Sequence, residues 1–330
     1  MPQFTNSNLQ ILFEAAQKLN LSPTVISVKP PVLSFQAGRR THRITEKSFG
    51  LNSTKSINLS RNKSKTIKKL SQHHLPTPQQ IIVHSVKEYL SVCQSAHWRI
   101  PQVIKPLTGQ KGQFVFLNIK NLTAGQSAVK EVLKNYPDGC LIESYHFGSD
   151  YRFLVLNFKV IGVSQRLAPT ITGDGKSTIK QLIDQENIKR HQQFLQTNRR
   201  LLNRMRHWPR LAWYLHLQGV SLQAVLPKNK TITLYPIPNF STGGSVKTIS
   251  LRSVNPALIR LAESAAKIIG LKICGIDMIV KPDLSGECRI IELNSDPGLR
   301  LHDWPNQGKP QHTAETILSY ISTGINSKLS

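Results

Sequence analysis

Cysteine, acidic side chains and long apolar runs are all scarce in this sequence. Its 4 cysteines among 330 residues are scattered and form no Cys-x-x-Cys pair, which argues against a zinc site or a disulfide framework. No apolar run is long enough to cross a bilayer, and the first ten residues lack the basic-then-apolar pattern of a secretory signal. We therefore expect a cytoplasmic protein without a membrane partner.

The shortage of acids gives the chain an extreme charge. Asp and Glu total 18 against 43 Lys and Arg, for a net charge of +25, and no acid occurs between Glu186 and Glu263. Such a surface attracts polyanions, so nucleic acid, anionic lipid, an acidic partner, nucleotide phosphates and acidic substrates all stay open. Plain solubility is the alternative explanation of the charge.

Short apolar strands alternate with helical patterns along the chain, which is typical of an α+β protein with several lobes. We predict an N-terminal α/β lobe over 1–58, a central lobe over 59–143 and a C-terminal lobe over 144–330. The length is sufficient for each lobe to have its own core. The basic range 189–215 is predicted to be helical.

The range 275–298, GIDMIVKPDLSGECRIIELNSDPG, carries the most information. Two apolar runs flank a turn, which predicts a pair of strands. Asp277 lies in the first strand, and Glu292 and Asn294 share one face of the second because side chains alternate along a strand. Pairing can bring Asp277 beside them, and two carboxylates with an amide suit Mg²⁺. A hairpin with a polar, solvated side is the alternative.

Two lysines and a glycine loop suit a nucleotide. Lys63 begins a predicted helix and Lys105 ends an apolar strand, where each can act as a point charge for phosphate oxygens. The loop at 108–112, with Gly109 and Gly112, can offer backbone N–H groups to phosphates. It matches neither a P-loop nor a dinucleotide fingerprint, and an ordinary turn is the alternative.

The chain after the next strand could line the rest of a nucleotide site. The backbone around Glu143 and Tyr145 could pair with an adenine edge, and Asp150 could accept hydrogen bonds from ribose hydroxyls. Two more glycine loops, 172–176 and 239–244, could bind an anion through backbone N–H groups. Surface turns are the alternative for each.

Taken in order, these segments resemble the ATP-grasp carboxylate–amine ligases. They are most similar to the ATP-grasp part of cyanophycin synthetase and of bifunctional glutathione synthetases. The similar segments cover almost the entire chain: RNK at 61–63, VIKPLTGQKG, IESYHFGSDYRFLV, APTITGDGKSTI, LPKNKTITL, NFSTGG, GIDMIV and IELNSDPGLRLH.

The resemblance implies an ATP-grasp fold of three lobes, with ATP between the central and C-terminal lobes and Mg²⁺ or Mn²⁺ as the metal. It assigns the metal to Asp277, Glu292 and Asn294. It assigns the ATP phosphates, adenine and ribose to Lys63, Lys105, Gly109, Gly112, Glu143, Tyr145 and Asp150. The acyl phosphate and substrate carboxylates would contact Arg152, Arg166, Ser241, Gly243, Gly244 and Arg300.

The implied reaction joins a carboxylate of an amino acid or peptide to an amine through an acyl phosphate. Several positions depart from these relatives near the acceptor side and leave the substrates open. Val246, Lys247 and Thr248 follow the STGG motif where an acid is usual, Gln165 replaces another acid, and the loop has Lys111 and Gln113 in place of His and Arg. A complete cyanophycin synthetase is not expected, because no Mur-ligase-like half is present.

Two other functions stay open. The net charge of +25 also suits a polyanion- or nucleic-acid-binding protein on a degenerate ATP-grasp scaffold, although no nucleic-acid motif is present. A ligase could instead modify the acidic tail of a protein docked on residues 189–210. Homo-oligomerisation is likewise open.

Overall fold

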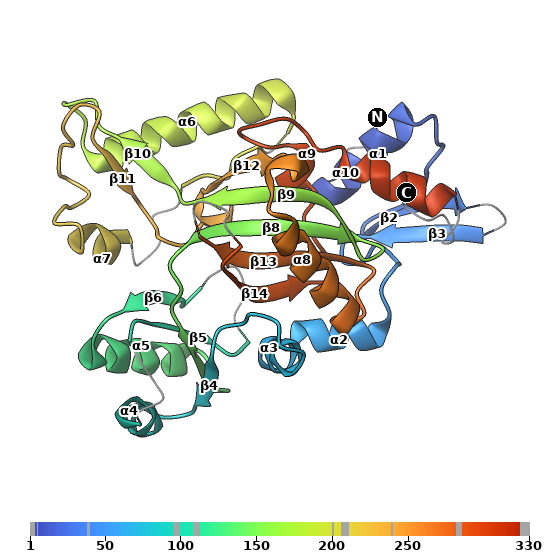
Figure 1. Cartoon of the computed structure of the whole chain (residues 1–330). Helices are drawn as coiled ribbons and strands as arrows, with labels where there is room; N and C mark the ends of the chain where they lie inside the picture. Colours follow the sequence, from blue (N-terminus) through green and yellow to red (C-terminus); the bar gives the residue numbers. More distant parts are fainter. Residues whose placement is uncertain are drawn as a thin grey trace. The chain divides into compact units, whose positions relative to one another are not determined.

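The computed structural model describes residues 4, 6–37, 40–95, 100–108, 113–199, 201–205, 211–238, 240–281 and 286–323. The chain divides into two compact units. Unit 1 comprises Met1–Gln80, His146–Gln165 and Thr248–Ser330, and unit 2 comprises Ile81–Tyr145 and Arg166–Lys247. Mixed helices and strands confirm the predicted α+β class (Figure 1). The division into three lobes stays a prediction.

Unit 1 is built on a five-stranded sheet of order β12-β9-β8-β13-β14 (Figure 1). The strands are β8 (Ser149–Leu156), β9 (Lys159–Leu167), β12 (Ser245–Ile249), β13 (Ile273–Val280) and β14 (Cys288–Asn294). Strand β13 pairs antiparallel with both β8 and β14. This pairing confirms the strand pair predicted over 275–298.

Helix α8 (Pro256–Ile269) supplies much of the core on one face of that sheet. It begins with proline at its first turn and ends at Gly270 in the left-handed region (φ 79°), as helices often do. Its apolar side packs in one cluster with Phe153, Ile276 and Met278. Because side chains alternate along a strand, Asp277 and its partner Arg152 lie on the opposite face.

The N-terminal part of unit 1 contacts strand β14 through two of its helices, α2 and α3. It contains α1 (Ser7–Lys18), the antiparallel strands β1 (Thr24–Val28), β2 (Pro31–Ala37) and β3 (Arg40–Thr45), then α2 (Thr54–Arg61) and α3 (Lys63–Gln72). The Asn62 side chain caps α3 by accepting from the backbone N–H of Lys65, so Lys63 is the first helical residue, as predicted. Helices α9 (Arg300–Asp303) and α10 (Thr313–Ser322) complete the unit, and α1 contacts both.

Unit 2 contains a four-stranded sheet of order β4-β7-β5-β6 and a smaller two-stranded sheet. The larger sheet consists of β4 (Gln80–Val83), β5 (Gln102–Pro106), β6 (Phe116–Ile119) and β7 (Cys140–Ser144), and its core includes residues of α4 (Val86–Gln94) and α5 (Leu122–Asn135). The second part consists of β10 (Thr170–Thr172), β11 (Thr231–Thr233), α6 (Ile179–Thr197) and α7 (Leu211–His216). Short 3-10 turns occupy Phe240–Thr242 and, in unit 1, Leu251–Ser253.

The prediction of one helix over 189–215 is wrong in part. Helix α6 ends at Thr197, because Asn198 adopts a left-handed conformation (φ 50°) that stops the helix. The next described residues, through Met205, are not helical, and α7 starts only at Leu211. Among the described helices, none combines the length and apolar composition that spanning a bilayer requires.

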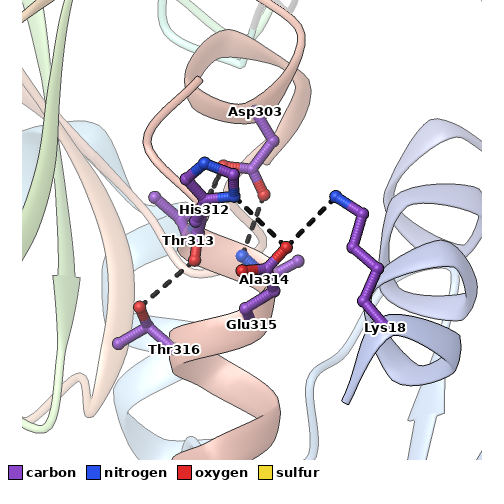
Figure 2. A network of polar contacts seen from close by, with 7 residues as sticks. All are labelled: Lys18, Asp303, His312, Thr313, Ala314, Glu315 and Thr316. Carbon is purple, nitrogen blue, oxygen red and sulfur yellow. Dashed lines mark hydrogen bonds and ion pairs between the residues drawn. The ribbon is translucent and has the colours of Figure 1, made fainter. Parts of the chain in front are cut away.

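A network of polar contacts fixes the N-terminus of α10 (Figure 2). The Asp303 carboxylate accepts from the backbone N–H groups of Thr313 (2.7 Å) and Ala314 (2.8 Å) and from the Thr313 hydroxyl (2.9 Å). Glu315 lies 3.2 Å from both Lys18 of α1 and the His312 ring. The aspartate therefore does the capping, while the exposed lysine only reaches across from α1.

We predict that Asp303→Ala lowers the free energy of unfolding by about 1–2 kcal/mol, because two helix N–H groups lose their acceptor. Lys18→Ala removes only an exposed ion pair and should change the free energy of unfolding by less than about 0.5 kcal/mol. Urea unfolding followed by circular dichroism measures both. Equal effects of the two variants would contradict the capping role.

Candidate functional site

The three predicted metal ligands lie on one face of the unit 1 sheet. Asp277 of β13 is directly opposite Glu292 of β14, and Asn294 is opposite Gly275. Opposed residues in an antiparallel pair project to the same side of the sheet. The pairing thus brings together two carboxylates and one amide.

A β-bulge makes this arrangement possible. Asp277 pairs with Glu292, but the next residue, Met278, pairs with Ile290, so β14 has an extra residue at 291. In a regular strand Ile290 and Glu292 would point the same way. With the bulge, Ile290 is buried in the apolar core with Met278, while Glu292 reaches the polar face.

Arg152 of β8 holds Asp277 from the other side. It is directly opposite Asp277, and both side chains are buried. The guanidinium donates through Nε to Asp277 Oδ1 and through Nη2 to Oδ2 at 2.9 Å. This two-pronged contact fixes the orientation of the carboxylate.

Asn294 and Lys63 extend the cluster to Glu292. With its amide oxygen turned toward Arg152, Asn294 accepts from Arg152 Nη2 at 3.1 Å and donates to Glu292 Oε1 at 3.3 Å. Lys63 Nζ lies 3.7 Å from Glu292 Oε2, and both of these side chains are partly exposed. The network therefore runs from a buried end at Arg152 and Asp277 to an open end at Glu292 and Lys63.

Gly275 is a site residue that the sequence reasoning missed. A Cβ atom at this position would lie 2.7 Å from both Cδ and Nη1 of Arg152. The glycine therefore leaves the space through which the guanidinium crosses β13. A glycine inside an apolar strand was the available signal, since it often marks a close approach of another group.

Helix α9 places two buried basic residues, Arg300 and His302, in the same unit. His302 Nδ1 lies 2.9 Å from Gln311 Oε1, while Gln311 Nε2 donates to the carbonyls of Val163 (3.0 Å) and Ile249 (2.8 Å). The Gln311 oxygen must therefore accept, which puts the histidine proton on Nδ1. Burial lowers the pKa of His302 to about 4, helped by the charge of Arg152, so the ring is neutral near pH 7.

In unit 2 the structure brings together two residues assigned to the nucleotide. Lys105 of β5 and Glu143 of β7 form an ion pair of 2.7 Å, and both side chains are almost fully buried. The strands are antiparallel neighbours with Val103 opposite Glu143, so both side chains lie on one face. The backbone N–H of Tyr145 donates to Pro101 O at 3.1 Å, which engages one of the groups expected to meet adenine.

The remaining predicted residues lie on several different elements. Asp150 is half-buried on β8, opposite Ile279, and Arg166 is half-buried near the end of β9. Gly243 and Gly244 are buried, and Arg190 Nη1 donates to the Gly243 carbonyl at 2.8 Å. Gly109, Gly112 and the Ser241 side chain lie outside the described residues. The roles assigned to all of these residues stay predictions.

The loop at 172–176 is closed by its own aspartate. The Asp174 carboxylate accepts from the N–H groups of Lys176 (2.9 Å) and Ser177 (2.7 Å) and from the Ser177 hydroxyl (2.7 Å). These hydrogen bonds lower the pKa of Asp174 to about 2. The N–H groups of Lys176 and Ser177 therefore already have an anionic partner within the chain.

The donor set in unit 1 fits a hard divalent cation. Asp277, Glu292 and Asn294 offer only oxygen ligands, and Mg²⁺ commonly takes one or two carboxylates from a protein. No group of three or more His, Cys, Asp and Glu that could hold a metal occurs in the described part of the chain.

We predict that Gly275→Ala lowers the free energy of unfolding by about 1–3 kcal/mol, because the new methyl group collides with Arg152. Gly298→Ala is the matched control, since a Cβ there meets no atom within 4 Å. Chemical unfolding of both variants measures the difference. If Gly275→Ala were as stable as Gly298→Ala, the close approach of Arg152 would not constrain this position.

A second prediction concerns pH. His302 has a pKa of about 4 in the folded protein against an ordinary 6.5, so the unfolded chain takes up a proton that the folded chain refuses. The neutral ring therefore contributes up to about 3 kcal/mol to the free energy of unfolding. This contribution is present above pH 6.5 and is lost as the pH falls toward 4. As the pH falls from 6.5 to 4, the free energy of unfolding should decrease less in His302→Gln than in wild type. Parallel curves for His302→Gln and wild type would refute the assignment.

Three comparisons with known proteins agree with one another. The family model described as the RimK-like ATP-grasp domain matches residues 60–194. Cyanophycin synthetase of Synechocystis sp. is 35% identical over 230 residues, which is 67% of this chain and 26% of that protein. The glutathione biosynthesis bifunctional protein of Listeria welshimeri is 29% identical over 225 residues, 66% of this chain and 28% of the relative.

The fold has a solved counterpart. A bifunctional glutathione synthetase from Pasteurella multocida matches 96% of this chain and 44% of its own chain, with a TM-score of 0.66 and 20% sequence identity. The chain spans about a quarter to a third of the length of the curated relatives it matches. The chain therefore carries a RimK-like ATP-grasp domain, and its relatives include cyanophycin synthetase and the bifunctional glutathione biosynthesis protein.

Proposed function

We propose that the chain is an ATP-dependent carbon–nitrogen ligase that joins a carboxylate of an amino acid or peptide to an amine. ATP-grasp ligases use ATP with a divalent metal, and the relatives named above are synthetases of this kind. The observation that carries the proposal is the oxygen cluster of Asp277, Glu292 and Asn294 on one face of the sheet.

Without a metal, the positive and negative charges of the cluster balance. Two carboxylates face two cations, Arg152 on the buried side and Lys63 on the open side. The Lys63–Glu292 contact is long, at 3.7 Å, and both side chains are partly exposed. Lys63 can therefore leave Glu292 and turn to a phosphate oxygen at little cost in free energy.

Mg²⁺ held by Asp277, Glu292 and Asn294 would offset charge on the triphosphate of ATP. The residues of the chain would do the rest by positioning and charge. Arg152 holds the Asp277 carboxylate in one orientation through two hydrogen bonds, as outer-shell partners of metal ligands do. Lys63 would bind phosphate, and we assign Arg300 to the charge that develops on the acyl group.

The reaction would proceed in two steps. The substrate carboxylate attacks the γ-phosphorus of ATP and forms an acyl phosphate with release of ADP, and the amine then displaces inorganic phosphate to form the amide. No enzyme nucleophile is required. Burial raises the pKa of Cys140 and Cys274 to about 12 and that of Cys288 to about 11, so these thiols stay protonated and unreactive near pH 7.

The substrates are proposed only as a class. Thr248, one of the residues that stands where relatives usually carry an acid, uses its hydroxyl to donate to Lys309 O at 2.8 Å. A Cβ atom on Gly308 would lie 2.3 Å from the same hydroxyl oxygen. The threonine thus holds the chain after α9 in place, and we infer that the acceptor differs from that of relatives with an acid here.

The alternative of a polyanion-binding protein has no support in the comparisons. The buried cations also weaken it. Arg190, within the basic range, donates to Glu186 (2.8 Å), Asn203 O (2.6 Å) and Gly243 O (2.8 Å), so it serves the fold of unit 2.

We predict that Glu292→Ala abolishes Mg²⁺-dependent ADP release, lowering it by more than about 100-fold, while the fold stays nearly intact. The matched control is Glu287→Ala, at the start of the same strand pair, where the glutamate is exposed and pairs with Lys281. The assay follows ADP and phosphate with pairs of amino acids and dipeptides as substrates. Equal turnover in Glu292→Ala and wild type would refute the metal assignment.

A further inference from the structure

Two asparagines of the N-terminal region hold the chain on either side of the candidate metal ligands. Asn52 precedes α2 and Asn8 is the second residue of α1. We propose that both are positioning residues, which fix Asn294 and Arg300 by binding the backbone between them. This inference rests on the proposed function, because it assigns Asn294 to the metal and Arg300 to the substrate.

Asn52 joins the ends of the two strands that carry the ligands. Its Nδ2 donates to Ile273 O at 2.7 Å, and its Oδ1 accepts from Ile273 N at 3.0 Å, so the amide pairs with β13 as a neighbouring strand would. The same Nδ2 donates to Ser295 O at 3.1 Å. Ser295 directly follows Asn294, whose pairing with Gly275 is the last of the β13–β14 ladder.

Asn8 binds the continuation of the same segment. Its Nδ2 donates to Pro297 O at 3.0 Å and its Oδ1 accepts from Leu299 N at 2.9 Å. Leu299 is the residue before Arg300, where α9 begins. Together the two amides bind the backbone of Ser295, Pro297 and Leu299. The backbone positions of the flanking residues, Asn294 and Arg300, are thereby fixed.

The chemistry of these contacts requires an amide. Each asparagine donates and accepts at once, and an aspartate would place a carboxylate against the carbonyl oxygens that the Nδ2 group now meets. Backbone groups left without these partners would have to find others or face water. Outer-shell partners that orient metal ligands typically change metal affinity by about 10- to 100-fold when removed.

Neighbouring contacts allow a positioning role to be separated from a purely structural one. Ser53, beside Asn52, caps α2 by accepting from Ser56 N at 3.2 Å, and its hydroxyl donates to Ser56 Oγ at 3.0 Å, so both contacts stay within the start of that helix. Lys18, on the same helix as Asn8, reaches Glu315 on the surface (Figure 2). Ser53→Ala and Lys18→Ala are therefore matched controls for Asn52→Ala and Asn8→Ala.

The test uses Mn²⁺ as a probe of the metal site. Mn²⁺ binding to the full chain in the presence of ATP is measured by electron paramagnetic resonance, together with the unfolding midpoint in urea. We expect Asn52→Ala and Asn8→Ala to weaken Mn²⁺ binding by about 10- to 100-fold. The Mn²⁺ affinity of Ser53→Ala and Lys18→Ala should stay within about twofold of that of wild type. We expect this even where their unfolding midpoint in urea falls as much as that of the asparagine variants.

The outcomes separate the two proposals. Wild-type Mn²⁺ affinity in folded Asn52→Ala and Asn8→Ala overturns the positioning role and leaves the proposed function standing. No Mn²⁺ binding by the wild-type chain with ATP overturns the metal site and this inference with it. Should Asn52→Ala not fold, Asn8→Ala decides alone, because the buried face of α1 at Leu9, Leu12 and Phe13 is unchanged in that variant.

Discussion

The buried ion pair between Arg152 and Asp277 is the interaction on which the polar face of unit 1 depends. Removing two charges from water costs several kcal/mol per ion unless good geometry and further hydrogen bonds offset it. Here the guanidinium takes both oxygens of Asp277 and reaches Asn294, and Gly275 leaves it room to do so. The pair therefore constrains which residues can occupy positions on three adjacent strands, β8, β13 and β14.

The bulge at residue 291 connects this polar face to the apolar core. It lets one strand serve the core at Ile290 and the cluster at Glu292, which strict alternation would forbid. The core with α8 can then be closely packed while the opposite face carries charge. Asn8 of α1 and Asn52, which precedes α2, add their amides at the end of the same strands. Stability and ligand placement are thus properties of the same few backbone segments.

Much of this arrangement is predictable from local sequence, and the rest depends on tertiary contacts. The strand pair and the helix start at Lys63 follow from apolar runs, a turn and an Asn–Lys junction. The bulge could not be predicted, because its register is set by packing against α8. The pairing of Lys105 with Glu143 joins residues far apart in sequence. The helix predicted over 189–215 is correct only at its two ends, because α6 stops at Thr197, where Asn198 adopts a left-handed conformation, and α7 begins at Leu211.

In a chain with 43 basic and 18 acidic residues, where the carboxylates are placed says more than the net charge. Asp303 caps α10, Asp174 closes its loop, and Glu143 pairs with Lys105 at 2.7 Å, so each is engaged at short range. Glu292 differs: its contacts are 3.3 Å to Asn294 and 3.7 Å to Lys63, and its side chain is 32% exposed. A carboxylate kept beside the buried Arg152–Asp277 pair, yet held only loosely, is suited to exchange its partner for a cation that arrives with ATP. In the proposed metal site, Asp277 is the fixed ligand and Glu292 the adaptable one.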